Sequence, residues 1–120
     1  MTIHELNHVA IYVTDVARSS NFYRTVLKLE PMPRPNFNFP GAWFQLGKQE
    51  LHLIADVDGP FFATHERNHF ALRVDDVADW ENHLRSVKAD FAPGKFRPDG
   101  ALQIFLRDPD GHVIELFAPP

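Results

Sequence analysis

An internal repeat constrains the fold of this chain more than any other feature of its sequence. Residues 7–17 read NHVAIYVTDVA and residues 68–78 read NHFALRVDDVA, so the two segments share seven identical residues in eleven positions. The second segment begins 61 residues (68 − 7) after the first, about half of the 120-residue chain. Self-similarity at a long fixed spacing indicates a duplicated structural unit. We therefore expect two copies of one supersecondary unit.

Each copy begins with a predicted strand that is followed by a predicted helix. Residues 8–13 and 69–74 are rich in β-branched and apolar side chains, which favours strands. Asp15 and Asp76 come next, and a short carboxylate in that place caps a helix by accepting hydrogen bonds from its free amide groups. Apolar residues at helical spacing follow, namely Val16, Phe22, Tyr23, Val26 and Leu27 in the first copy and Val77, Trp80, Leu84 and Val87 in the second.

Further strands are predicted toward the end of each copy. They span 41–46 and 50–54 in the first copy, and 102–107 and 112–117 in the second. The turn sequence Asp108-Pro109-Asp110-Gly111 separates the last two strands. Residues 31–40 contain four prolines, and we expect them to form a loop without regular structure.

The resulting pattern is βαβββ, twice, which predicts an α+β fold of two modules in a single domain. We expect module one at about residues 1–55, a linker at about 56–67 and module two at about 68–120.

The composition excludes several classes of function. The chain has no cysteine, so disulfides, thiolate metal sites and cysteine nucleophiles are excluded. Its formal net charge is −4 and its Lys and Arg residues are scattered, so nucleic acid is not an expected partner. No apolar run reaches the about 20 residues that a membrane-spanning helix needs, and residues 1–8 lack the features of a signal peptide. We expect a cytoplasmic protein that binds no membrane.

Four residues at matched places in the two copies predict a metal site. His8 and His69 begin the first strands of their copies, and His52 and Glu115 lie in the last strands. The spacings are 44 residues (52 − 8) and 46 residues (115 − 69), so a pseudo-twofold axis would bring the four together. Three imidazoles and one carboxylate suit one divalent Zn, Fe, Ni, Co or Mn ion better than Ca or Mg.

Five segments of the sequence together carry a resemblance to a known family. They read NHVAIYVTDVARSSNFYRTVLKLEP, AWFQLG, LHLI, NHFALRV and DPDGHVIELF. These segments resemble the vicinal oxygen chelate superfamily, which includes glyoxalase I, fosfomycin-inactivating thiol transferases, extradiol dioxygenases and bleomycin-binding proteins. The resemblance covers nearly the whole chain and implies a glyoxalase-like fold, in which the two modules form a curved mixed β-sheet around a metal cleft. It also implies that His8, His69 and Glu115 are metal ligands and that the protein forms a homodimer.

The sequence departs from the glyoxalase I pattern at two places. His52 stands where glyoxalase I has a carboxylate ligand, and Tyr12 stands where it has an arginine that binds glutathione. An arginine does occur at the matching place of the second copy, Arg73. A small anionic substrate is therefore expected, while glutathione is not implied.

Other residues are candidates for contacting a small anionic or aromatic substrate. Arg73 shares a strand face with His69, and its planar guanidinium could bind a carboxylate or phosphate. Tyr12, Gln103 and Phe105 are further candidates for binding substrate. Glu50 shares a strand face with His52 and is a candidate for moving protons. Glu115, in the last strand of the second copy, is a second candidate. We expect Arg34 and Arg97, in aromatic-rich loops, to be solvated.

The predicted function is that of a metal-dependent enzyme of glyoxalase type, a lyase or isomerase, in which the metal binds substrate oxygens as a Lewis acid. Three alternatives stay open. The first is an extradiol-type Fe(II) dioxygenase that uses His8, His69 and Glu115. The second is a thiol transferase that acts on a small electrophile, and the third is a protein that sequesters a small molecule without chemistry.

Overall fold

The repeat in the sequence corresponds to a repeat in the structure. The computed structural model describes residues 1–56, 65 and 67–120, and the chain divides into the units Met1–Phe61 and Phe62–Pro120. Each unit is a βαβββ module with a four-stranded mixed sheet, which confirms the predicted α+β fold. Most of the predicted linker, at about 56–67, lies outside the described residues.

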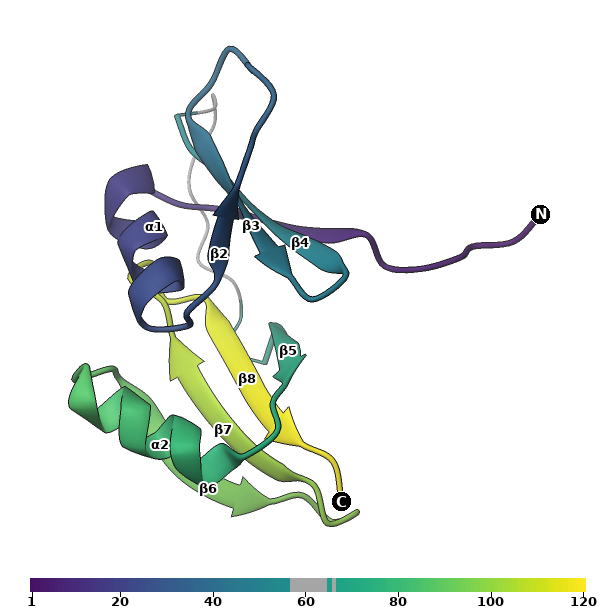
Figure 1. The fold of residues 1–120 in the computed structure, drawn as a ribbon, viewed down its shortest axis with the longest axis vertical. Helices are drawn as coiled ribbons and strands as arrows, with labels where there is room; N and C mark the ends of the chain where they lie inside the picture. The colour runs from purple at the N-terminus through teal and green to yellow at the C-terminus, as the bar shows by residue number, and fades with distance from the viewer. Residues whose placement is uncertain (57–64, 66) are drawn as a thin grey trace. The chain divides into compact units, whose positions relative to one another are not determined.

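The first unit contains one helix and four strands (Figure 1). Its strands are paired in the order β1-β4-β3-β2, and β1 is parallel to β4 while the other pairs are antiparallel. The elements are β1 (His8–Tyr12), α1 (Val16–Thr25), β2 (Glu30–Met32), β3 (Gly41–Leu46) and β4 (Gln49–Ile54).

The second unit repeats this arrangement with the strand order β5-β8-β7-β6, and its helix α2 packs across the sheet. Again the pair formed by the first and last strands, β5 and β8, is parallel. The elements are β5 (His69–Arg73), α2 (Val77–Ser86), β6 (Phe91–Phe96), β7 (Leu102–Arg107) and β8 (Val113–Ala118).

Both helices begin and end in the same way. The carboxylate of Asp15 accepts a hydrogen bond from the backbone N–H of Arg18, and that of Asp76 accepts from the N–H of Ala78, as the sequence predicts for helix caps. Beyond each helix a lysine adopts a left-handed backbone conformation, Lys28 at φ 58° and Lys88 at φ 57°. That conformation ends a helix because it turns the chain away from the helical path.

Each sheet has one face packed against its helix and an opposite face, here called the open face. In the first unit the ring of Tyr23 on α1 lies 6.2 Å from the ring of Phe44 on β3. Because side chains alternate along a strand, Leu51 and Leu53 share the face of Phe44, whereas His52 lies on the open face. The second unit buries Ile104, Leu106, Ile114 and Leu116 in the same way, and Glu115 lies on its open face.

The prediction of a loop over 31–40 is wrong at its first two residues, because Pro31 and Met32 belong to β2. The strand β6, which contains Pro93, was not located by the sequence patterns at all. Both strands are at the edges of their sheets, where a proline can stand without removing a ladder hydrogen bond. The prolines in β2 and β6 are therefore the reason that the sequence patterns did not locate these two strands.

The edge strand β6 contains an irregularity that changes which of its side chains reach the open face. Its register with β7 shifts between Ala92 and Lys95, so that Ala92 is opposite Phe105 and Lys95 is opposite Gln103. Without the extra residue, strand alternation would turn Lys95 toward the helix. The shift thus brings Lys95 to the open face of the second unit.

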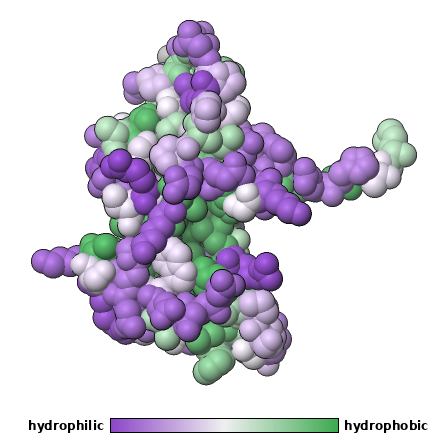
Figure 2. Space-filling view, viewed as in Figure 1, coloured by the Kyte–Doolittle hydropathy of each residue, from purple (hydrophilic) through white to green (hydrophobic). Residues whose placement is uncertain are grey.

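The outer surface that Figure 2 displays is predominantly hydrophilic. Neither of the two helices in the described part of the chain has the length and the apolar character needed to cross a membrane.

Candidate functional site

The candidate ligands of the first unit, His8 and His52, are diagonal neighbours on the open face. β1 and β4 pair so that His8 is opposite Glu50 and Ala10 is opposite His52. The small side chain of Ala10 leaves room, and the rings of His8 and His52 stack with centroids 4.1 Å apart. The Nδ1 atom of His8 lies 2.9 Å from Oδ1 of Asn7, which leaves Nε2 of His8 available.

His52 is held on three sides. Its second ring face stacks on Trp43, its partner across β3 and β4, with centroids 3.9 Å apart and planes 2° apart. Its Nε2–H donates a hydrogen bond of 2.9 Å to Oε1 of Glu50, because a carboxylate can only accept. The predicted shared face of Glu50 and His52 is therefore a direct contact, and His52 is only 8% exposed.

The second unit has the same diagonal arrangement, with Ala71 opposite Glu115 and His69 two residues before Ala71. The Nε2 atom of His69 lies 3.1 Å from Oε1 of Glu115, whose side chain is 5% exposed. Phe105, the partner of Glu115 across β7 and β8, presents its ring edge-on to His69 at a centroid distance of 5.5 Å. Phe105 thus corresponds to Trp43 of the first unit.

The orientation of His69 determines which of its nitrogens is available. Its Nδ1 lies 3.0 Å from the backbone carbonyl oxygen of Arg67, and since a carbonyl can only accept, Nδ1 carries the proton. In a neutral ring Nε2 then has a lone pair, and this lone pair would lie beside the carboxylate of Glu115. Such a pair of acceptors is stable only if the ring is protonated or if a cation is bound by both groups.

The spacing of His69 and Glu115 and the orientation of His69 fit the binding of one transition metal ion. Two ligands held about 2.1 Å from one metal ion at tetrahedral angles are about 3.4 Å apart, close to the His69–Glu115 spacing. A ligand histidine ordinarily donates its other N–H to a carbonyl or carboxylate, as His69 does to Arg67. Within either unit, however, no three His, Asp or Glu side chains among the described residues gather at one point.

The residues predicted to bind substrate are spread over both open faces. Arg73 is opposite Phe117 on the open face of the second unit and is exposed. Gln103 is opposite both Phe117 and Lys95 on the same face. Tyr12 is opposite Ile54 in the first unit and is half-buried. Phe105, also predicted to bind substrate, has its ring against that of the candidate ligand His69.

A pocket of about 590 Å³ lies beside His69 within the second unit. Three cationic side chains and one carboxylate line it together with apolar residues: Arg67, Lys95, Arg107 and Asp90, with Phe91 and Phe105 among the apolar ones. The sequence patterns missed the three cations. Strand alternation from Phe105 could have indicated Arg107, whereas the register shift in β6 concealed Lys95.

Arg97 is engaged by a neighbouring carboxylate. Its Nε and Nη2 atoms donate hydrogen bonds of 2.8 and 2.6 Å to Asp99, and its guanidinium lies 5.8 Å from the ring centre of Phe117. The hydrogen bond from Arg97, and after it one from the backbone N–H of Ala101, lower the pKa of Asp99 to about 2. The same bond to Asp99 raises the pKa of Arg97, to which the charge of Glu115 also contributes.

Comparison with known proteins identifies the family. The family described as Glyoxalase/Bleomycin resistance protein/Dioxygenase superfamily matches residues 5–116. The chain belongs to this superfamily. The resemblance inferred from the sequence motifs is therefore confirmed.

The names of relatives in this superfamily describe different activities. "Glyoxylase I 4" of Arabidopsis thaliana is 29% identical over 119 residues, which cover 92% of this chain and 68% of that protein. "Metallothiol transferase FosB" of Staphylococcus saprophyticus subsp. saprophyticus is 29% identical over 120 residues, covering 95% and 76%. The solved structure of a putative glyoxalase family protein from Bacillus anthracis has a TM-score of 0.87 at 23% identity, covering 100% and 98%, and shows the same fold.

Proposed function

We propose that this protein is a metal-dependent enzyme of the superfamily that acts on a small, anionic, oxygen-bearing substrate. The proposed ligands are His8, His52, His69 and Glu115, and the metal is one divalent Zn, Fe, Ni, Co or Mn ion. The observation that carries the proposal is the 3.1 Å distance from His69 Nε2 to a buried carboxylate oxygen of Glu115, with Nδ1 of His69 held at the carbonyl of Arg67. This spacing and orientation suit two ligands of one metal ion.

When bound, the metal supplies a Lewis acid for substrate oxygens. The residues of the chain have separate tasks. His69 is oriented by the carbonyl of Arg67 before any ligand arrives, which lowers the cost of forming the site. Glu50 accepts a hydrogen bond of 2.9 Å from Nε2–H of His52, so it is, with Glu115, a candidate for moving a proton. Glu50 must release Nε2 if His52 ligates through that atom.

The pocket beside His69 suggests how an anionic substrate is held. Among the described residues that line this pocket, Arg67, Lys95 and Arg107 supply three cations and Asp90 one carboxylate, and Phe91 and Phe105 supply apolar surface. A carboxylate or phosphonate with a small apolar body matches that lining. We propose that the substrate occupies this pocket with its reactive oxygens toward His69, while Tyr12, Arg73 and Gln103 are further candidates for contacting it.

A glyoxalase-type lyase or isomerase reaction is the first candidate, in keeping with the relative named "Glyoxylase I 4". Thiol transfer to a small electrophile is the second, since the relative FosB is named a metallothiol transferase and the cationic pocket would suit an anionic acceptor. Measurement of free thiol during the reaction distinguishes the glyoxalase-type reaction from thiol transfer. An isomerisation regenerates the thiol that it uses, whereas a transfer consumes one thiol for each electrophile. Oxygen uptake by the iron-loaded protein with a diol would instead indicate the dioxygenase alternative.

The metal is tested by elemental analysis of protein purified without chelator. We expect a stoichiometric amount of one transition metal in the native protein and its loss in His8→Ala and His69→Ala. The matched control is His4→Ala, which removes an exposed imidazole four residues before His8. A native protein that takes up none of the five metals, even after reconstitution, would refute the proposed site and favour a small-molecule binding protein. We also propose that the protein is a homodimer, which sedimentation in the same preparations tests.

A further inference from the structure

The first unit holds a second pocket, of about 390 Å³, whose lining does not include the candidate metal ligands. It lies where α1 faces β2 and β3, and Ser20, Asn21 and Arg24 line it from the helix. Pro31, Met32, Trp43 and Phe44 supply apolar walls from the strands, and Arg34 completes it. His8 and His52, by contrast, lie on the open face of the sheet.

The charge of this pocket has one sign. Arg24 and Arg34 carry positive charges, and no carboxylate is found among the described residues that line it. Neither guanidinium forms an ion pair with a described carboxylate. Two uncompensated cations in one pocket are unexpected in a chain with a net charge of −4, because the negative residues are in excess overall.

Arg34 is not the solvated loop residue that we expected from the sequence. Its guanidinium carbon lies 4.8 Å from the ring centre of Phe37 and 5.1 Å from that of Phe39, and its Nη2 donates to the carbonyl oxygen of Phe39. Residue 41 is a glycine, which leaves room for the guanidinium of Arg34, because a Cβ built on Gly41 would lie 2.9 Å from Nε of Arg34. These contacts hold the cation in one place, and a donor held in place loses little entropy on binding.

One donor of Arg34 has no acceptor. The Nε atom is buried and without a hydrogen-bond partner among the described residues. A buried donor without a partner costs about 1–3 kcal/mol, so an acceptor from a ligand would relieve a real penalty. Arg24 is different, because it is exposed and is held by one long hydrogen bond of 3.3 Å to Asn21. Arg24 can therefore move to meet a ligand that Arg34 binds.

We propose that this pocket binds a small organic anion, a phosphate monoester or carboxylate with a flat apolar body. The anionic group is bound by Arg34 and Arg24, and the apolar body lies against Pro31, which shares the helix side of the sheet with its strand partner Phe44. The volume is within the range of small-molecule sites, which is about 300–1,000 Å³, and is too small for a folded partner. The candidate metal ligands are not among the residues that line this site, and the proposal does not require a bound metal.

The test follows the backbone amides of Asn21 and Ala42, which line the pocket, by nuclear magnetic resonance. Phenyl phosphate is titrated into this protein after metal removal, which keeps the result independent of the proposed metal site. We expect saturable binding, with inorganic phosphate at least about tenfold weaker because it lacks the apolar body, and phenol without effect because it lacks the charge.

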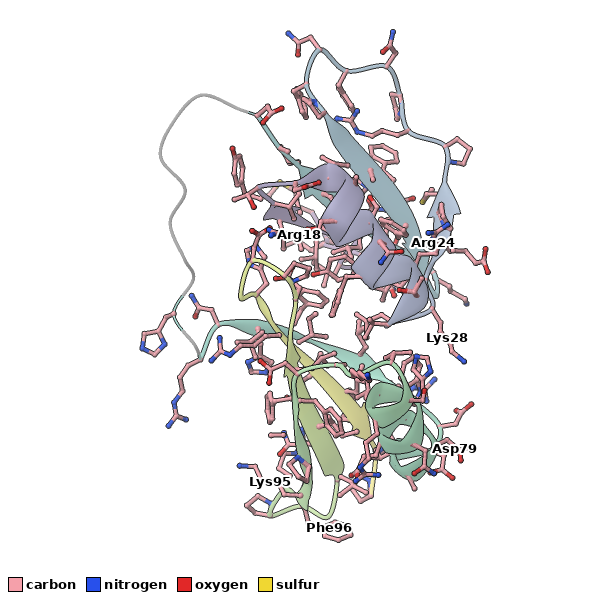
Figure 3. All side chains as sticks on the ribbon, turned by 90° about the vertical axis from the view of Figure 1, so that its left-hand side faces the viewer. Arg18, Arg24, Lys28, Asp79, Lys95 and Phe96 are labelled. Carbon is pink, nitrogen blue, oxygen red and sulfur yellow. The ribbon has the colours of Figure 1, made fainter. Side chains whose placement is uncertain are left out.

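Charge-removing variants locate the binding. Arg24→Gln and Arg34→Gln should each weaken phenyl phosphate binding by about tenfold or more, and Lys95→Gln in the second unit should not change it. The matched control is Arg18→Gln, which removes the same charge from the same helix at a residue that does not line the pocket (Figure 3). If Arg34→Gln does not fold, Arg24→Gln against Arg18→Gln decides the question alone. Equal losses in those two variants, or no saturation with the native residues, would overturn the proposal.

Discussion

The Nε2 atom of His69 lies 3.1 Å from Oε1 of Glu115, across two parallel strands whose residues are 46 positions (115 − 69) apart in the chain. We predict that Glu115→Gln weakens transition-metal binding by at least about tenfold, because an amide oxygen is a poorer ligand than a carboxylate and carries no charge. Metal competition with a chromophoric chelator measures the change. Glu30→Gln, on the exposed edge strand β2, is the control, and equal metal affinity in the two variants would contradict the prediction.

Gly94 marks a close approach between the edge strand β6 and the helix α2. Its backbone N–H donates a 2.9 Å hydrogen bond to Oε1 of Glu81, and a Cβ on Gly94 would lie 2.5 Å from that oxygen. We predict that Gly94→Ala lowers the free energy of unfolding by about 1–2 kcal/mol, because Glu81 must move and the bond is lost. Urea denaturation measures it.

A double-mutant cycle isolates the cause of that loss. In the background of Glu81→Ala the substitution Gly94→Ala should cost much less, since the oxygen that the new methyl group meets is gone. An undiminished cost would show that the backbone of β6, rather than Glu81, is what requires the glycine.

Lys95 should contribute to anion binding beside His69. We predict that Lys95→Gln weakens the binding of inorganic phosphate at the pocket of the second unit by about fivefold at low salt, because one of three lining cations is removed. The measurement is a nuclear magnetic resonance titration that follows the backbone amides of Phe105 and Val113. Lys88→Gln, just beyond α2, is the matched control. The prediction fails if both variants bind phosphate equally.

Asp99 should titrate well below other aspartates. Its pKa is about 2 because Arg97 and the N–H of Ala101 donate hydrogen bonds to it. A depressed pKa in the folded state stabilises the fold at pH values above the ordinary 3.8, and this contribution is lost as the pH falls through about 2. The carboxyl carbon resonance of Asp99 reports its pKa directly. Replacing Arg97 by Gln should return it toward the ordinary value, and an unchanged pKa would contradict the assigned cause.

Local patterns in the sequence were sufficient for the repeat, the helix caps and six strands, namely β1, β3, β4, β5, β7 and β8. The caps at Asp15 and Asp76 could be predicted because a cap depends on residues only two or three positions away. The strands 41–46 and 102–107 were predicted with the bounds that the structure has. The spacings within the repeat indicated that His52 and Glu115 occupy matching places in the two copies, as do His8 and His69.

The tertiary structure determines which side chains from different strands come into contact, and local sequence patterns do not contain this information. The diagonal contact of His69 with Glu115 depends on the register of two strands that are distant in the chain, and a shift of one residue would move Glu115 to the helix side. The stacking of His8 on His52 depends likewise on the pairing of two strands, and the position of Lys95 depends on one extra residue in β6. The alternation of side chains is a property of each strand by itself and can be read from the sequence. The meeting of side chains from different strands is set by the hydrogen-bond register between those strands, which only the folded chain has.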